Sequence, residues 1–158
     1  MNPNPGNSPF VGIISDTHGL VRPSALEALA GARVILHAGD IGSSEVLHAL
    51  SAVAPVHAVR GNTDVEPWAS GLPAREWLNI DGVDIVVLHD LVKLDIDPVA
   101  AGVSVVVTGH SHRPELLERN GVLFVNPGSA GPRRFHLPAT VARLTVSEGR
   151  VRAEIVPL

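Results

Sequence analysis

Short, continuous apolar runs separated by polar loops dominate the first half of the sequence. Runs of this kind are typical of strands that are buried on both faces of a sheet. The predicted strands are residues 10–14, 34–38 and 56–59, and apolar positions at helical spacing predict helices that begin near Pro23 and near Ser43. A strand–loop–helix pattern repeated in this way predicts parallel strands joined by right-handed crossovers.

The second half of the sequence has a different pattern, dominated by hairpins. The dipeptides Asp81-Gly82, Asn120-Gly121 and Glu148-Gly149 each separate two apolar or alternating runs, which indicates tight two-residue turns. The predicted strands here are 76–80, 83–88, 103–107, 115–118, 122–125, 140–146 and 150–156, with a loop and a short helix over 91–101. An α/β half followed by a mostly antiparallel half predicts two packed sheets with helices outside them.

Composition narrows the possible classes of protein. Hydrophobic residues make up 45% of the 158 residues and aromatic residues only 3%, which predicts a single domain over 10–158 with an aliphatic core. Residues 1–9 are polar and rich in proline, and we interpret them as a flexible tail. The net charge of −4 argues against extended nucleic-acid binding. The absence of cysteine excludes disulfides and thiolate sites and favours the cytoplasm. No apolar run approaches the roughly 18 residues of a membrane span.

Polar side chains follow almost every predicted strand. Asp40 is central, because the buried run before it stops at Gly39 and presents a carboxylate at the carboxyl end of a strand, where ligands bind in open α/β sheets. The other side chains of this kind are carboxylate, amide or imidazole groups at the ends of neighbouring strands. The full set is Asp16, His18, Asp40, Asn62, His89, His110 and His112.

This set of donors predicts a metal site. Carboxylate and imidazole suit manganese, iron, cobalt, nickel or zinc, and we take manganese as the first expectation. Seven donors are too many for one tetrahedral ion but suit two divalent ions bridged by Asp40. Two ions about 3.5–4 Å apart are the arrangement that clamps the attacking and leaving oxygens in phosphate-ester hydrolysis.

Each motif alone has a simpler interpretation. Asp40 could cap the helix that follows it, Asp16-Thr17-His18 could be a polar turn, and His110 with His112 could form a surface turn. All of these motifs occurring together, each after a predicted strand, favours the metal site.

At these residues the sequence resembles the calcineurin-like metallophosphoesterases, and in particular their small, single-domain, YfcE-like phosphodiesterase branch. The resemblance covers residues 11–134. It rests on an ordered series of motifs: Asp16-Thr17-His18, Gly39-Asp40, Gly61-Asn62-Thr63-Asp64, His89, Gly109-His110-Ser111-His112 and Asn126-Pro127-Gly128-Ser129. The resemblance implies a four-layer α/β/β/α sandwich of two mixed sheets flanked by helices.

The resemblance also implies roles for individual residues. One metal would be held by Asp16, His18, Asp40 and His112, and the other by Asp40, Asn62, His89 and His110. A hydroxide activated by the two metals would attack phosphorus, with Asn62 and His110 near the developing charge. Residues expected to support the ligands from behind are His37, Thr63, Asp64 and Asp90; we expect Asp64 to orient Asn62 or a ligand histidine.

Two positions depart from the family pattern. Thr63 stands where phosphomonoesterases carry a histidine that protonates the leaving group, which favours diesters with good leaving groups. Asp90 stands where the family usually has glycine, and it could orient His89, bind a metal or face solvent.

The expected activity is therefore hydrolysis of a small phosphodiester. The family also suggests self-association. The alternative is a non-catalytic scaffold with the same fold, like the retromer subunit, but the complete set of ligand-competent residues favours an enzyme. A nuclease acting on polymeric DNA is disfavoured by the acidic charge balance.

Overall fold

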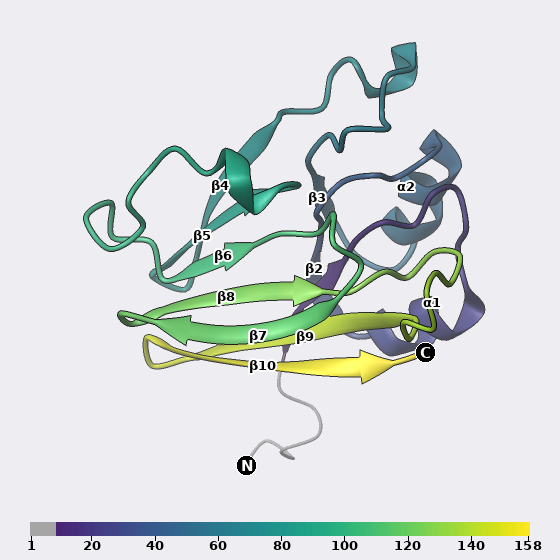
Figure 1. The fold of residues 1–158 in the computed structure, drawn as a ribbon. Coiled ribbons are helices and arrows are strands. Elements are labelled where there is room, and N and C mark those ends of the chain that lie inside the picture. Colours follow the sequence, from purple (N-terminus) through teal and green to yellow (C-terminus); the bar gives the residue numbers. More distant parts are fainter. Residues whose placement is uncertain (1–8) are drawn as a thin grey trace, which may run out of the picture.

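Two five-stranded mixed sheets pack face to face in the computed structural model, which describes residues 9–158 (Figure 1). The predicted tail lies outside the described residues, except for Pro9. The first sheet has the order β10-β9-β1-β2-β3 and the second the order β4-β5-β6-β8-β7. The strands are β1 (Phe10–Ile14), β2 (Ala32–His37), β3 (Val56–Ala58), β4 (Arg75–Ile80), β5 (Val83–Leu88), β6 (Val105–Val107), β7 (Pro114–Arg119), β8 (Val122–Pro127), β9 (Thr140–Ser147) and β10 (Arg150–Pro157).

Each sheet contains three neighbouring parallel strands extended by antiparallel pairs. In the first sheet β1, β2 and β3 are parallel, as the strand–loop–helix pattern predicts, and β3 forms one edge. On the other side of β1, β9 pairs antiparallel with β1 and with the edge strand β10. In the second sheet β5, β6 and β8 are parallel, and hairpins add β4 and β7 at the edges. The carboxyl ends of the parallel strands of both sheets therefore meet at one side of the sandwich.

The main core lies between the sheets and is aliphatic, as the composition predicts. Ile13 and Leu36 of the first sheet and Val87, Val107 and Val125 of the second belong to one buried cluster. The predicted hairpin turns are also confirmed. Both residues of each turn have positive φ, as at Asp81 (50°) and Gly82 (84°), which is the backbone of a type I′ turn.

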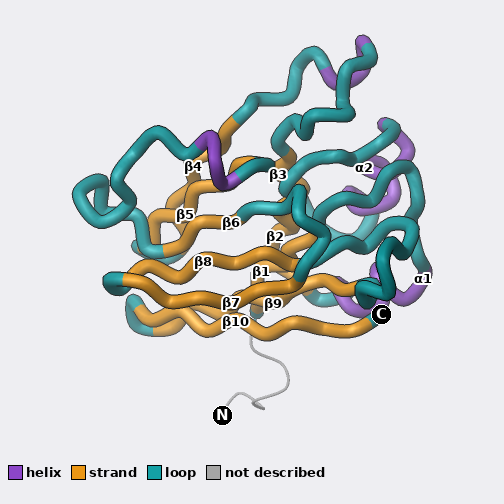
Figure 2. Tube along the Cα trace, in the orientation of Figure 1, coloured by secondary structure: helices purple, strands orange, loops and turns teal. Residues whose placement is uncertain are grey.

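The helices lie on one outer face. Helices α1 (Pro23–Leu29) and α2 (Ser44–Ser51) cover the first sheet, where Leu29, Ile35 and Leu50 share a second buried cluster (Figure 2). In the described part of the chain, no helix is long and apolar enough to cross a membrane.

The outer layer of the second sheet is much thinner than the first. It consists of the 3₁₀ turn η2 (Leu91–Lys93) and the loop after it, where Leu94 and Ile96 pack against Val86 and Val106 of the sheet. The predicted sandwich of two mixed sheets is confirmed, but its fourth layer is a turn and a loop. The remaining short turn, η1 (Pro67–Ala69), lies between β3 and β4.

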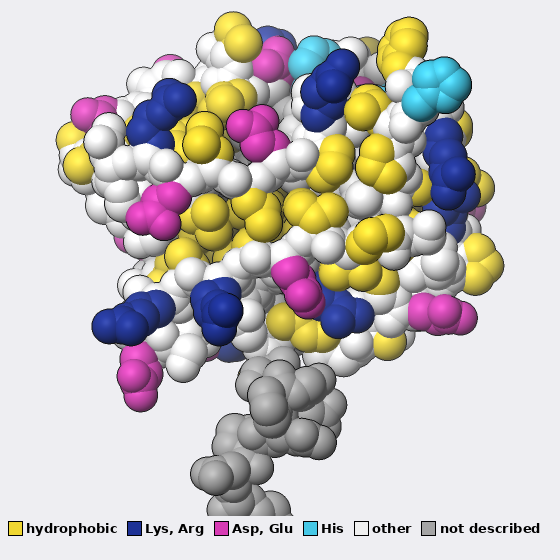
Figure 3. Space-filling model, turned by 60° about the horizontal axis from the view of Figure 1, so that its bottom comes forward, with side chains coloured by type: hydrophobic (Ala, Val, Ile, Leu, Met, Phe, Trp, Pro, Cys, Tyr) yellow, Lys and Arg dark blue, Asp and Glu magenta, His cyan; other side chains and the backbone are white. Residues whose placement is uncertain are grey.

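The face of the molecule beneath β7 and β10 carries no block of single-sign charge (Figure 3). Hydrophobic side chains gather in a band across its middle. Lysine or arginine and aspartate or glutamate side chains both lie around that band.

A buried histidine joins the ends of β1 and β2. The ring Nδ1 of His37 accepts a hydrogen bond from the Gly39 backbone N–H (3.1 Å), so Nε2 carries the proton and donates to the Thr17 hydroxyl (3.0 Å). Thr17 in turn donates to the Ile41 carbonyl (2.8 Å). Burial, reinforced by the positive charge of His89, lowers the pKa of His37 to about 3. His37 is therefore a neutral structural residue whose ring nitrogens are both occupied.

The neutrality of His37 predicts a specific pH dependence of stability. The unfolded state binds a proton below pH 6.5 while the folded state does so only below about pH 3, so stability falls on acidification through this window. In chelator-treated protein, the His37→Gln variant should lose about 1.4 kcal/mol per pH unit of this slope, because glutamine does not titrate. Urea unfolding of wild type and variant between pH 4 and 6 measures it. Parallel pH profiles would contradict the assignment.

Candidate metal centre

The loops at the carboxyl edge of the first sheet are held together by backbone hydrogen bonds. The N–H of Asp16 donates to the Gly39 carbonyl and that of His18 to the Asp40 carbonyl, both at 3.0 Å. These bonds fix the loop after β1 against the loop after β2. The loop after β3 also comes close, because a Cβ added to Gly61 would lie 2.1 Å from Asp40 Oδ1.

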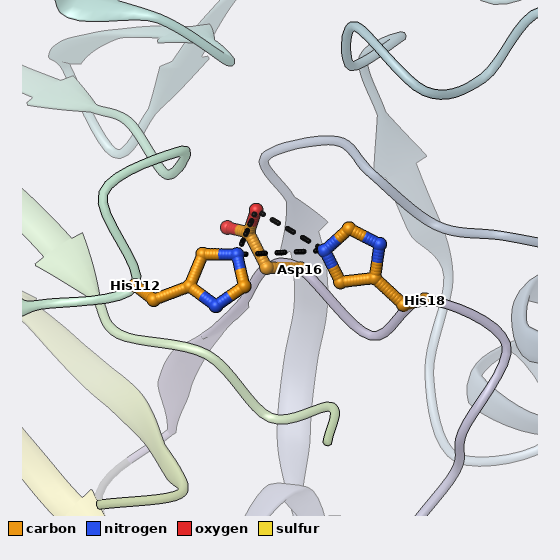
Figure 4. A group of neighbouring side chains, drawn as sticks. All are labelled: Asp16, His18 and His112. Atoms are coloured by element: carbon orange, nitrogen blue, oxygen red, sulfur yellow. Dashed lines mark hydrogen bonds and ion pairs between the residues drawn. The ribbon is translucent and has the colours of Figure 1, made fainter. Parts of the chain in front are cut away.

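Two of the predicted ligands at this edge come together with a third from the other sheet. Asp16 and His18 follow β1, His112 precedes β7, and the three side chains point toward one another (Figure 4). Asp16 Oδ1 lies 3.3 Å from His112 Nε2 and 3.8 Å from His18 Nε2. The two imidazole Nε2 atoms are 3.4 Å apart. All three potential donor atoms therefore face one small volume.

A second group forms beside it from Asp40, Asn62, His89 and His110. His89 Nε2 lies 3.3 Å from Asp40 Oδ2 and 2.9 Å from Asn62 Oδ1. His110 Nδ1 lies 3.3 Å from His89 Nε2 and 3.2 Å from Asn62 Oδ1. The structure thus brings together all seven residues that the sequence analysis singled out as ligands.

Asp40 lies between the two groups. Its Oδ2 is 3.8 Å from His18 Nε2 and 3.3 Å from His89 Nε2, while its Oδ1 accepts a hydrogen bond from the Thr63 backbone N–H (3.0 Å). One carboxylate oxygen therefore faces a histidine of each group. This is the position that a bridging ligand requires.

Burial, hydrogen bonds and neighbouring charges shift the pKa values of three ligand residues. Burial alone would raise the pKa of Asp40, but hydrogen bonds from His89 and from the Thr63 backbone outweigh it and hold that pKa well below its usual range. The pKa of His112 is lowered, mainly by burial. His89 Nδ1 lies 2.7 Å from the Ala38 carbonyl, which can only accept, so Nδ1 carries a proton and Nε2 points into the site. Burial alone would lower the pKa of His89, but the Asp40 hydrogen bond and the Asp16 charge outweigh it and raise that pKa, so a metal ion bound at Nε2 would replace a proton.

The residues present fit divalent cations. Asp16 Oδ1 is buried and has no hydrogen-bond partner among residues 9–158, although it points at two imidazoles. Within the same residues, the basic side chains within ion-pair distance of Asp16 or Asp40 are all histidines, and no lysine or arginine lies that close. Two buried carboxylates that converge with imidazole nitrogens and have no lysine or arginine partner among these residues form a site where a bound cation would supply positive charge.

The backbone of the site is unusual. Five of the seven ligand residues have positive φ, a left-handed conformation that non-glycine residues rarely adopt and that costs of the order of 1–3 kcal/mol each. The φ angles lie between 46° and 71°, at Asp16, His18, Asp40, His110 and His112. Strain of this kind concentrates at functional sites, where surrounding structure holds it in place.

Asp64 supports the site differently from the sequence-based expectation. Its carboxylate accepts hydrogen bonds from the backbone N–H groups of Ile41 (3.0 Å), Gly42 (3.1 Å) and Gly61 (2.9 Å). It forms none with Asn62 or a ligand histidine among the described residues. A short loop offers several unpaired N–H groups, and the buried carboxylate satisfies them, so Asp64 ties the loop that carries Asp40 to the loop that carries Asn62.

The sequence left three roles open for Asp90, and the one hydrogen bond of its side chain among the described residues belongs to none of them. Its Oδ1 accepts a hydrogen bond from the Val92 backbone N–H (3.1 Å) and so caps η2. The side chain also lies between two clefts that flank the metal-ligand residues, since it lines both.

The sequence analysis did not single out Ser15, Asn126 or Ser129 as supporting residues. The Ser15 hydroxyl donates to Asp16 Oδ2 (2.6 Å), and the Ser129 hydroxyl donates to the Asp16 carbonyl (3.0 Å). Asn126 Nδ2 donates to the Gly109 carbonyl (3.0 Å). The Asn-Pro-Gly-Ser motif at the end of β8 therefore braces the loops that carry Asp16 and His110, and its position was the only sequence signal for this role.

Comparison with known proteins agrees with this geometry. The model of the calcineurin-like phosphoesterase superfamily domain matches residues 10–149. A probable metallophosphoesterase of Methanocaldococcus jannaschii is 32% identical over 97% of this chain and 83% of its own length.

Two solved structures extend the comparison. YfcE, a phosphoesterase from E. coli, is 25% identical, with a TM-score of 0.65 over 86% of this chain and 88% of its own. Vps29 from Entamoeba histolytica, solved in complex with zinc, is 26% identical, with a TM-score of 0.72 over 94% and 98% of the two chains. The family match spans nearly all the described residues, including every predicted ligand, and the chain belongs to the calcineurin-like phosphoesterase superfamily.

Proposed function

We propose that this protein is a dinuclear metal-dependent phosphodiesterase that hydrolyses small phosphodiesters. The observation that carries the proposal is the pair of three-residue ligand groups, Asp16, His18 and His112 beside Asp40, His89 and His110, with Asp40 Oδ2 between them. Family membership supports a phosphoesterase, and the complete ligand set supports two ions.

The protein's own groups would orient both the ions and the substrate. Divalent ions bound here would supply Lewis-acid charge and lower the pKa of a bound water. His89 is fixed by its contact with the Ala38 carbonyl, and Asp16 by Ser15 and by the His110 backbone N–H (3.1 Å). His110 is exposed, and its Nδ1 faces Asn62, so these two side chains are available to contact a phosphate oxygen.

The proposal favours diesters over monoesters because of Thr63. An exposed threonine follows Asn62, where monoesterases of the superfamily carry a histidine that protonates the leaving group. A hydroxyl does not release a proton readily at neutral pH, whereas histidine titrates near it. Esters with good leaving groups need no such acid.

A Vps29-like scaffold is the second candidate, favoured by the similarity to that protein. Metal binding alone does not separate the two candidates, because the Vps29 structure itself contains zinc. Hydrolysis does separate them.

We also propose manganese as the metal, the cytoplasm as the location and a small molecule as the substrate. Mixed carboxylate and imidazole donors support manganese as the working ion. The absence of cysteine supports a reducing cytoplasm, and the net charge of −4 supports a small substrate over an extended nucleic acid. Self-association stays a proposal drawn from the family resemblance.

The hydrolysis test uses Asp40→Asn. A neutral amide bridges two cations poorly, so kcat/KM for bis(4-nitrophenyl) phosphate with manganese should fall by about a hundredfold or more, and bound metal should decrease. Asp97→Asn is the matched control, because exposed Asp97 only accepts backbone hydrogen bonds such as that from Val99. No manganese-dependent hydrolysis by wild type would favour the scaffold, and normal activity with full metal content in Asp40→Asn would contradict the bridging role.

A second variant, Thr63→His, tests the choice of substrate. A grafted imidazole should raise kcat/KM on an alkyl phosphomonoester, by at most the roughly 10²–10⁴-fold contributed by general acids, and change it little on an activated aryl diester. The measurement is the ratio of kcat/KM for the two substrates in both proteins, with metal content checked. An unchanged ratio would mean that Thr63 does not face the leaving group.

A further inference from the structure

An apolar cleft opens beside the metal-ligand residues on the thinly covered face of the second sheet. It has a volume of about 480 Å³, within the range of small-molecule sites. His110 and Asp90 line it at the ligand end. From there it follows β7 and β8 as far as Arg119 at the opposite end of β7.

Large hydrophobic side chains that remain open to solvent form much of the cleft wall, with Glu115 and Arg119 on either side of Leu117 along β7. Val92 is 91% exposed, Leu91 45% and Leu117 39%. Phe124 lies directly across from Leu117 in the β7–β8 register and adds an aromatic wall. Exposed apolar side chains are unremarkable singly, but gathered in one cleft they indicate a binding site for an apolar group.

A more polar cleft lies on the other side of Asp90. It measures about 650 Å³ and adjoins Asn62 and His89. Its lining carries charges of both signs: Arg60, Arg75, Lys93, Asp64, Asp90 and Asp95. Arg75 pairs with Asp95, which leaves Arg60 and Lys93 as the cations to consider. Neither of these cations has an ion-pair partner among residues 9–158. The Asp40–His89–His110 group therefore has an apolar cleft on one side and a polar, cation-bearing cleft on the other.

We propose that the apolar cleft binds an aryl or similarly apolar ester group of the substrate, with Leu117 and Phe124 as specificity-determining residues. This inference rests on the proposed phosphodiesterase function. A phosphodiester has two ester groups, and two clefts that adjoin one ligand group can receive one each. The preferred substrates are then unsymmetrical diesters, with one apolar arm and one polar arm.

Binding of two product-like phosphates tests the cleft separately from turnover. The probes are 1-naphthyl phosphate and methyl phosphate, measured by calorimetry with manganese-loaded and with chelator-treated protein. Wild type should bind the naphthyl compound more tightly than methyl phosphate. Leu117→Ser should reduce that preference about tenfold, which corresponds to about 1.4 kcal/mol, because the variant removes apolar surface that the naphthyl ring would bury.

Leu116→Ser is the matched control. Leu116 is the preceding residue on the same strand and is equally exposed at 39%, but successive residues of a strand face opposite sides, and Leu116 does not line the cleft. This variant should keep the wild-type preference. Circular dichroism melts of both variants verify that they are folded.

Kinetics on bis(4-nitrophenyl) phosphate distinguish failure of this inference from failure of the proposed function. Leu117→Ser should raise KM about tenfold with kcat within about twofold, and Leu116→Ser should change neither. If wild type hydrolyses the diester and the two variants behave alike, the cleft assignment is overturned and the function stands. If wild type hydrolyses nothing, the function is overturned and the cleft loses its role in substrate binding. Equal affinity of wild type for both phosphates also overturns the cleft assignment.

Discussion

Two buried carboxylates, Asp16 and Asp40, set the main constraint on this structure. Each lies among imidazoles, and within the described residues neither has a lysine or arginine partner. Burying unpaired negative charge is costly, so a fold with this arrangement is stable only if other contacts compensate or a cation binds. Groups for both occur at the same edge of the sandwich. Each carboxylate accepts hydrogen bonds, and histidine nitrogens that could bind a metal ion surround both.

The hydrogen bonds to these carboxylates also join the two sheets. Asp16 Oδ2, on the loop after β1, accepts the backbone N–H of His110 from the second sheet. Close approach of this kind requires glycine. A Cβ at Gly109 would lie 2.1 Å from the Ser15 hydroxyl, and one at Gly61 would lie 2.1 Å from the Asp40 backbone nitrogen. The glycines that flank the ligands in sequence are therefore part of the packing that brings the carboxylates together.

Most of the fold, and the grouping of the seven candidate side chains at one edge, could be predicted from sequence, because both follow from local patterns that place strands and the polar residues after them. Runs such as Val83–Leu88 and turns such as Asn120-Gly121 specify strands and hairpins by their own chemistry. The contacts of Asp64 and Asn126 could not be predicted, since they depend on which loop backbone lies opposite. The thin layer over the second sheet follows the sequence pattern, which predicts a loop and a short helix over 91–101, whereas the resemblance implied flanking helices that residues 94–104 do not form.

The most direct test of the account is the number and position of the bound ions. Crystals grown with manganese and measured at its absorption edge should show two anomalous peaks. One peak should lie among Asp16, His18 and His112, and the other among Asp40, His89 and His110, with Asp40 contacting both ions. A single peak, or ions bound only outside these residues, would contradict the dinuclear centre.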